Sequence, residues 1–153
     1  MKAAIFTINT EMYQAEGECP TATALRELLE QVGFEVKAAK ALPAEQRVIE
    51  TVMKQLSESQ SVNLILTIGA NGYLQDDCAP DAVMDVVERL LPGIGEAIRA
   101  YNLKRSKKAM LDCSVAGIHR KTLIMNLSAQ EKLALADLEY ILPEVIEVVE
   151  TIC

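Results

Sequence analysis

The residues best suited to chemistry in this chain follow a single apolar run at residues 62–68. The tetrad Gly69-Ala70-Asn71-Gly72 ends that run, and Asp76 and Asp77 come shortly after it. Backbone amides around glycines can hold a phosphate or another anion, although the same tetrad is equally typical of a simple turn. Asp77 also has two interpretations: a ligand of Mg²⁺ in a phosphoryl-type transfer, or an acid that only opens a helix.

The elements around the tetrad predict where it lies. The run at 62–68 is nearly all apolar, which is typical of a strand buried on both faces of a parallel sheet. Pro80 then supplies a residue type that favours the first turn of a helix. In open α/β sheets, ligands bind beyond the carboxyl ends of such strands. A small-molecule site in this chain is therefore predicted at the tetrad.

Strand-like and helix-like segments alternate through the first two-thirds of the chain. This order predicts a three-layer α/β/α fold with a mostly parallel sheet, formed as one domain by residues 1–153. A loop is expected at 9–21, a hairpin within 114–127 with His119 on its surface, and a helix break at Pro143. The other predicted strands lie at 3–8 and 34–39, and the predicted helices at 25–32, 43–56, 80–91, 94–101, 133–142 and 145–152.

The composition limits the classes of partner. With 153 residues and a formal net charge of −7, the chain is poorly suited to nucleic acid or an anionic membrane surface, so a small molecule or another protein is expected. Its four cysteines lie far apart and form no zinc or disulfide pattern, which favours free thiols in a reducing compartment. No stretch approaches ~18 consecutive apolar residues, and the N-terminus has no signal-peptide pattern. We expect a cytoplasmic protein.

Three segments, in one order, carry a resemblance to a known family. Leu64 to Gly72 with Asp77 to Ala82 matches a turn T-[TS]-G-G-T-G followed by D-x-T-P-[DE]-A. Pro92 to Arg99 matches P-G-[FI]-G-E-x-[MIL]-R. The third segment matches A-M-L-S-R-x-V-A-G-x…K-x-L-I-x-N-L-P-G-S-P and covers residues 109–111, 115–118 and 121–127.

Over its whole length the chain thus resembles the molybdopterin-binding domain of molybdenum-cofactor biosynthesis proteins of the MogA/MoaB type, which adenylylate molybdopterin. The resemblance implies molybdopterin, ATP and Mg²⁺ as ligands, and a homotrimer as the assembly. It implies Asp77 as the catalytic and Mg²⁺-binding carboxylate. The ligand-binding positions that it implies are Thr7, Glu18, Gly69, Ala70, Asn71, Gly72, Asn126 and Ser128.

The chain departs from the family at positions expected near the ligand. Ala70 and Asn71 replace a glycine and a threonine, and Asp76 replaces an arginine. A second family carboxylate matches Ala44, and the neighbouring Glu45 is turned by about 100° if both lie on a helix. The apolar framework is kept, so the scaffold looks better preserved than the active site.

The chain also lacks basic residues that would supply counter-charge to phosphates. Cys113 stands where the family has an arginine, in addition to the arginine lost at Asp76. The basic run from Lys104 to Lys108 is either a solvated face or a phosphate contact.

Three hypotheses follow from these observations. The favoured one is a protein that binds molybdopterin or a related phosphorylated ligand, with adenylyl transfer weak or lost. The second is an active Mg²⁺- and ATP-dependent molybdopterin adenylyltransferase in which other residues, Glu45 among them, replace the lost groups. The third is a trimeric interaction scaffold that binds no pterin.

Overall fold

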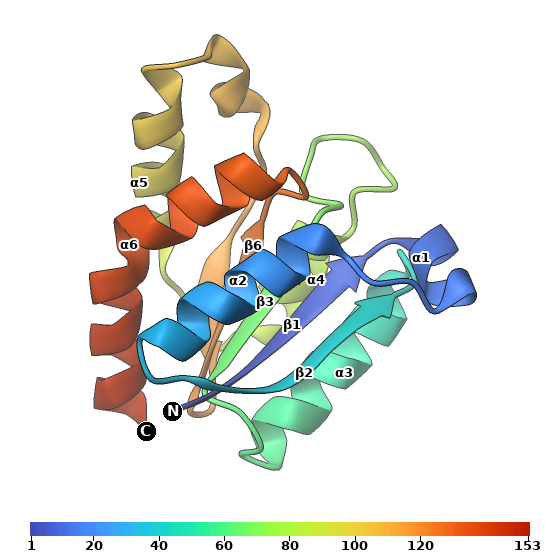
Figure 1. Ribbon diagram of the computed structural model, residues 1–153, viewed down its shortest axis with the longest axis vertical. Helices are drawn as coiled ribbons and strands as arrows, with labels where there is room; N and C mark the ends of the chain where they lie inside the picture. Colours follow the sequence, from blue (N-terminus) through green and yellow to red (C-terminus); the bar gives the residue numbers. More distant parts are fainter.

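The computed structural model describes residues 1–153, and a six-stranded sheet forms its centre (Figure 1). All strands run parallel except β5, which is antiparallel to both of its neighbours. The predicted three-layer fold with a mostly parallel sheet is therefore confirmed. In spatial order the strands are β2 (Glu35–Leu42), β1 (Lys2–Ile8), β3 (Leu64–Ile68), β6 (Thr122–Leu127), β5 (Ala116–His119) and β4 (Arg89–Leu90).

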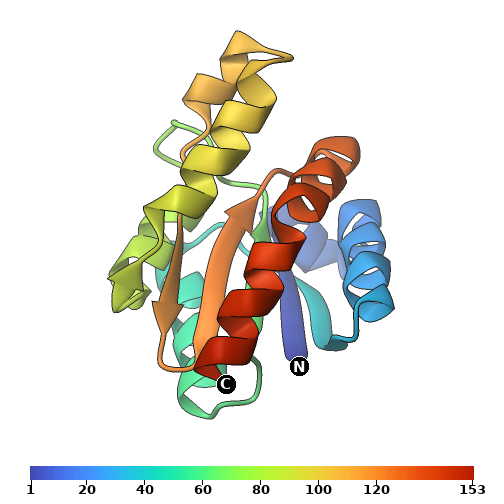
Figure 2. The same ribbon diagram turned by 90° about the vertical axis from the view of Figure 1, so that its left-hand side faces the viewer.

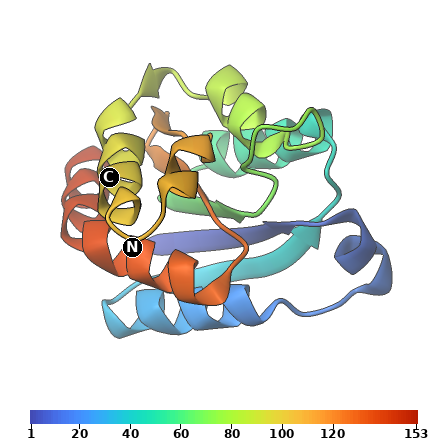
Figure 3. The same ribbon diagram turned by 90° about the horizontal axis from the view of Figure 1, so that it is seen from above.

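Helices cover both faces of the sheet (Figure 3). The core on one face includes residues of α2 (Pro20–Gln31), α5 (Pro92–Leu103) and α6 (Glu131–Ile152). The core on the other face includes residues of α3 (Gln46–Glu58) and α4 (Ala79–Val86). Two short helices complete the fold: α1 (Thr10–Ala15) beside β2, and the 3₁₀ helix η1 (Lys107–Leu111) beside α5.

The predicted central strand is confirmed. β3 lies between β1 and β6, and all five of its residues are buried. Leu64 and Leu66 contribute to the core beneath α2 and α6, whereas Ile65 contributes to the core beneath α3 and α4. Alternate side chains of a strand point to opposite faces, so burial on both sides requires the continuous apolar run seen in the sequence.

Two segments form an element other than the one that the sequence predicted. The expected loop at 9–21 contains α1, because the Asn9 side chain accepts a hydrogen bond from the Met12 N–H at 2.9 Å and caps the helix. The helix expected to continue to residue 91 ends at Val86. Arg89–Leu90 instead forms an edge strand that pairs with β5.

Helix α6 is one element of 22 residues, so the break predicted at Pro143 is wrong. The helix bends in its middle, as Figures 1 and 2 show, but it does not end there. A proline inside a helix costs about 3 kcal/mol. Residues on both sides of Pro143, such as Leu138 and Val145, are fully buried in the same core, which offsets that cost. No helix of the chain combines sufficient length and apolar character to cross a membrane.

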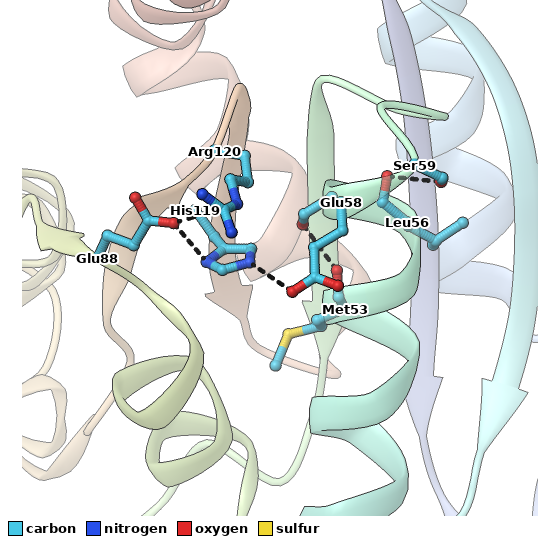
Figure 4. A network of polar contacts seen from close by, with 8 residues as sticks. Met53, Leu56, Glu58, Ser59, Glu88, His119 and Arg120 are labelled. Atoms are coloured by element: carbon cyan, nitrogen blue, oxygen red, sulfur yellow. Dashed lines mark hydrogen bonds and ion pairs between the residues drawn. The ribbon is translucent and has the colours of Figure 1, made fainter.

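His119 is buried, contrary to the expectation of a surface residue. It lies between two carboxylates (Figure 4), with Nδ1 3.2 Å from Glu88 Oε1 and Nε2 3.7 Å from Glu58 Oε1. The contact to Glu58 is too long for a hydrogen bond, and neither ring nitrogen has a hydrogen-bonding partner. His119 pairs with Thr122 at the start of β6. It therefore lies at the end of the sheet where the parallel strands begin, away from their carboxyl ends.

The close approach of β4 and β5 depends on Gly117. A Cβ at this position would lie 2.7 Å from the Arg89 carbonyl oxygen and 2.8 Å from Val87 Cβ. We expect Gly117→Ala to lower the free energy of unfolding by about 1–3 kcal/mol, measured by urea denaturation. Gly93→Ala is the matched control, because a Cβ there meets no atom within 4 Å. Equal stability of the two variants would contradict this account of the strand pairing.

Candidate functional site

A cavity of about 730 Å³ lies beyond the carboxyl ends of β3 and β6. The loop after β3 forms one part of its wall, α5 and η1 form another, and the segment from β6 into α6 forms the rest. The predicted site at the tetrad is thus next to a cavity large enough for a small molecule. Of the predicted ligand-binding residues, the cavity is lined by Asn71, Gly72, Asn126 and Ser128.

The other predicted residues lie outside this cavity. Thr7 and Glu18 line a separate pocket of about 300 Å³, together with Arg26 and Lys40. The first turn of α2 nevertheless contacts the loop before α6, because Thr21 Oγ1 donates a hydrogen bond to the Ala129 carbonyl at 2.8 Å. The structure therefore brings together predicted residues at the ends of β3 and β6, but it places Thr7 of β1 and Glu18 of the first loop in a second pocket.

Gly69 and Ala70 turn the backbone out of β3. Gly69 has φ +85° and Ala70 has φ +51°, both in the left-handed region. For alanine this region costs on the order of 1 kcal/mol, whereas glycine adopts it freely. Ala70 does not line the cavity, and its methyl packs against the core beneath α4. The departure from glycine therefore affects the backbone conformation of the turn rather than the room for a ligand.

Asn71 joins the turn to the segment before β5. Its Nδ2 donates to Asp112 Oδ1 at 3.1 Å and to Ser114 Oγ at 2.9 Å, and its carbonyl accepts from the Cys113 N–H at 3.0 Å. Ser114 also donates from its N–H and its hydroxyl to Asp112 Oδ1. One carboxylate oxygen thus accepts three hydrogen bonds and fixes two loops that are far apart in sequence.

Arg99 of α5 supports the same wall. Its Nη1 donates to the carbonyl oxygens of Ser114 at 3.0 Å and Asp112 at 3.3 Å. A Cβ on Gly95 would lie 2.8 Å from Arg99 Nη2, so this glycine leaves space for the guanidinium group. Sequence analysis did not select Arg99 as a site residue, although it ends the second segment that carries the family resemblance.

Asp137 is a second site residue that sequence analysis missed. It lines the cavity, is only 4% exposed, and accepts a hydrogen bond through Oδ1 from Asn102 Nδ2 at 2.9 Å. Burial raises its pKa from 3.8 to about 6, against the opposing effect of the Asn102 hydrogen bond. Its position in the sequence was a usable signal, because it falls among the buried apolar residues of α6 at helical spacing.

Three cations line the cavity. Arg105 and Lys108 belong to the basic run noted in the sequence, whereas Lys104 and Lys107 of the same run do not line the cavity. Lys132 of α6 is the third. Arg105 is held in place, since it donates to Asn102 Oδ1 at 3.1 Å and lies 4.8 Å from the centre of the Tyr101 ring. Part of the basic run thus reaches the site.

Asp77 is half-buried beside the cavity and does not line it. Its Oδ2 accepts a hydrogen bond from the Leu74 N–H at 3.0 Å and would lie 2.7 Å from a Cβ on Gly72, so the carboxylate packs against the turn. The local field is negative. Burial raises the pKa of the Cys78 thiol, and the charges of Asp81, Asp77 and Asp76 raise it further.

The second expected carboxylate position has no acid. Ala44 packs against the core beneath α3, and its N–H donates to Thr10 Oγ1 at 2.9 Å. Glu45 is exposed at the N-cap position of α3, where its side chain makes no capping hydrogen bond. No group of three or more His, Cys, Asp or Glu side chains in the chain is arranged to hold a metal ion. A metal held here would have to bind through fewer protein ligands and through its substrate.

Comparison with known proteins relates this geometry to one family. The profile of a family described as a probable molybdopterin binding domain matches residues 4–147. The molybdopterin adenylyltransferase of Haemophilus influenzae is 39% identical over 93 residues, which are 61% of this chain and 47% of that protein. The Escherichia coli enzyme of the same name is 36% identical over 99 residues, which are 65% of this chain and 50% of that protein. The chain spans about half the length of these curated relatives.

Two solved structures are similar over nearly the full chain. The molybdopterin biosynthesis enzyme MoaB of Thermus thermophilus has a TM-score of 0.85 and 32% identity, covering 97% of this chain and 96% of that one. The molybdopterin biosynthesis Mog protein of Mycobacterium ulcerans has a TM-score of 0.91 and 25% identity, covering 99% of each chain.

The raised pKa of Asp137 has a consequence for stability. Its folded-state pKa of about 6 lies above the ordinary 3.8, so folding favours the protonated form. The stability gained from that protonation is present below pH 3.8 and is lost as the pH rises through about 6. Asp137→Asn, which keeps an acceptor for Asn102, should therefore raise the free energy of unfolding by about 1–3 kcal/mol at about pH 7.5 and have little effect near pH 4.

Urea denaturation across this pH range measures the difference. Glu139→Gln changes an exposed acid two residues along the same helix and should show no comparable gain. A gain for Asp137→Asn that is the same at both ends of the pH range would show that the carboxylate charge is not its cause.

Proposed function

The chain belongs to the molybdopterin-binding domain family of molybdenum-cofactor biosynthesis, and from this premise we propose that it binds molybdopterin or a related phosphorylated pterin, with adenylyl transfer weak or lost. Residues 1–153 form the proposed binding domain. The observation that carries the proposal is the cavity beyond β3 and β6. It is large enough for a small ligand, and both acidic and basic side chains line it.

The cavity offers counter-charge to a phosphate group. Lys108 and Lys132 line it and make no ion pair within the chain, so their ammonium groups remain available to an anion. Asn71, Gly72 and Ser128 add polar groups at the ends of β3 and β6. This combination of cations and hydrogen-bonding groups suits a ligand that carries a phosphate on a polar ring system.

Two features disfavour efficient adenylyl transfer. The position of the second family carboxylate holds Ala44, which packs against the core. Asp76, Asp77 and Asp81 gather negative charge at the start of α4; burial is the main cause of the raised pKa of the Cys78 thiol, and these charges raise it further. Each close contact between like charges opposes a triphosphate by about 1–4 kcal/mol at ~4 Å. Because phosphoryl-type transfer relies on positioning and counter-charge, these features reduce the rate more than they reduce pterin binding.

Asp77 still fits a limited role toward Mg²⁺. Its Oδ2 is engaged by the Leu74 N–H, while Oδ1 accepts no hydrogen bond from the chain. Mg²⁺ is commonly held by one or two carboxylates together with substrate phosphates, and it would supply neutralisation of phosphate charge. Asp77 is the residue of this chain that would hold it.

One observation favours a working adenylyltransferase as the second candidate. Arg105 and Lys108 reach the cavity and restore part of the positive charge missing at Asp76 and Cys113. Under this alternative, Asp77 would keep its catalytic role, and Glu45 would take the place of the carboxylate absent at Ala44.

The binding proposal is tested with two lysines of the same basic run. Lys108 lines the cavity and Lys107 does not, although both are exposed members of η1. We expect the wild type to bind molybdopterin, Lys108→Ala to weaken that binding about 5- to 10-fold, and Lys107→Ala to leave it within about twofold, by fluorescence titration. Equal losses in both variants would indicate only a general effect of net charge.

The same preparations then test adenylyl transfer with ATP and Mg²⁺. We expect slow wild-type turnover and a gain of activity in the double variant Ala44→Asp, Asp76→Arg, since each group of this kind is worth about 10²- to 10³-fold. Robust wild-type turnover that Asp77→Ala abolishes would reject the weakened site and favour the second candidate.

Self-association as a homotrimer is also proposed, and it is the basis of the third candidate, an interaction scaffold. A groove of about 490 Å³ between the start of α5 and the middle of α6 is lined mainly by apolar residues, including Leu91, Ile94, Ala97 and Tyr140. Tyr140 is 54% exposed, and a second copy of the chain would cover it.

Sedimentation should give a species of three 16.8 kDa chains for the wild type and a smaller one for Ala97→Glu, which places a charge in the groove. A wild-type monomer at micromolar concentration would rule out the trimer. Retention of the trimer by a folded Ala97→Glu variant would exclude this groove as its interface.

A further inference from the structure

Asp137 and Asn102 form a buried polar pair in the wall of the cavity. Asp137 is 4% exposed and Asn102 is 9% exposed, and they come from facing positions on α6 and α5. Asp137 Oδ1 accepts from Asn102 Nδ2, and Asn102 Oδ1 accepts from Arg105 Nη2. Asp137 Oδ2 has no hydrogen-bonding partner within the chain. A nearly buried carboxylate therefore presents one unused oxygen at a ligand-sized cavity.

An acceptor of this kind selects ligands that carry N–H donors. Each carboxylate oxygen has two acceptor sites, so Oδ1 can accept a second bond while Oδ2 accepts its first. Two parallel N–H groups on a planar ring match the two oxygens in the same way as a guanidinium fork. A 2-amino-4-oxopyrimidine ring presents such a pair, from its 2-amino group and the adjacent ring nitrogen.

We propose that Asp137, oriented by Asn102, is the specificity-determining residue that binds the N–H edge of a 2-amino-4-oxopyrimidine ring in this cavity. The proposal rests on the proposed function, which makes a pterin the source of that ring. Guanine carries the same edge and is the alternative source. A ligand without such a donor pair would leave the buried carboxylate short of hydrogen-bonding partners. The free-energy cost of that loss disfavours binding of such ligands.

The pH dependence of binding follows from the groups around Asp137. Arg105, just after α5, favours its charged form, and Asp112, just after η1, disfavours it. Lys132 of α6 lines the same cavity. With a pKa of about 6, roughly one molecule in ten carries the charged carboxylate at about pH 5, compared with nearly all at about pH 7.5. A protonated carboxyl offers a donor where the ring also offers donors. Binding of the ring should therefore weaken about tenfold as the pH falls from about 7.5 to about 5.

The test compares two ligands that differ at one group. In 6-hydroxymethylpterin the 2-amino group is present, and in 6-hydroxymethyllumazine a carbonyl replaces it. We expect the full chain to bind the pterin at least about tenfold more tightly than the lumazine at about pH 7.5, by fluorescence titration or calorimetry. Asp137→Asn should reduce this ratio towards one and remove the pH dependence, while Glu139→Gln on the same helix should retain both.

The outcomes separate the inference from the proposed function. If the wild type prefers the pterin and folded Asp137→Asn keeps the same preference, the role of Asp137 is overturned while pterin binding stands. If guanosine monophosphate binds with the same dependence on Asp137 and the pterin does not bind, recognition of the ring edge is supported and the proposed function is overturned. If none of the three compounds binds to the wild type, both proposals are overturned.

Discussion

The side-chain amide of Asn126 links the strands at the end of the sheet where the cavity lies. It donates to Thr67 Oγ1 at 2.7 Å and accepts from the Val115 N–H at 3.0 Å, thereby joining β6 to β3 and to the segment before β5. Asn126 and Thr67 are almost fully buried. Because water cannot replace these partners, each unsatisfied group would cost about 1–3 kcal/mol. Val115 follows Ser114 directly, so the same amide fixes the wall that carries Asp112.

Residues that are unfavourable for stability lie near this end of the sheet. Ala70 adopts a left-handed backbone conformation that suits glycine, and Asp137 keeps a carboxylate among apolar residues of α6. By contrast, Leu64, Leu66 and Ile124 in the centre of the sheet are fully buried apolar side chains without such conflicts. Local conflicts of this kind persist at functional sites more often than in the rest of a domain. Their location is consistent with a cavity that retains a ligand-binding role.

The sequence predicted the sheet better than the site, for physical reasons. β3 was predictable because burial on two faces demands a continuous apolar run. The sequence alone could not show which lysines of the basic run reach the cavity. Lys108 lines it and the neighbouring Lys107 does not, and this depends on how the 3₁₀ helix η1 directs each side chain. Asn126 was selected as a ligand contact from the family resemblance, and its amide is used within the fold. Such tertiary partners leave no local pattern.

The position of β2 has a consequence for how the protein behaves in concentrated solution. β2 is an outermost strand of eight residues and pairs along one side only, with β1, so its other side offers unpaired backbone groups. An edge of this length is a template for aggregation between copies. Lys37 and Lys40 are exposed along it, and Lys37 is 2.7 Å from Glu35. Two strands approaching edge to edge would have to desolvate these charges, so the lysines act as a barrier against fibril-like association.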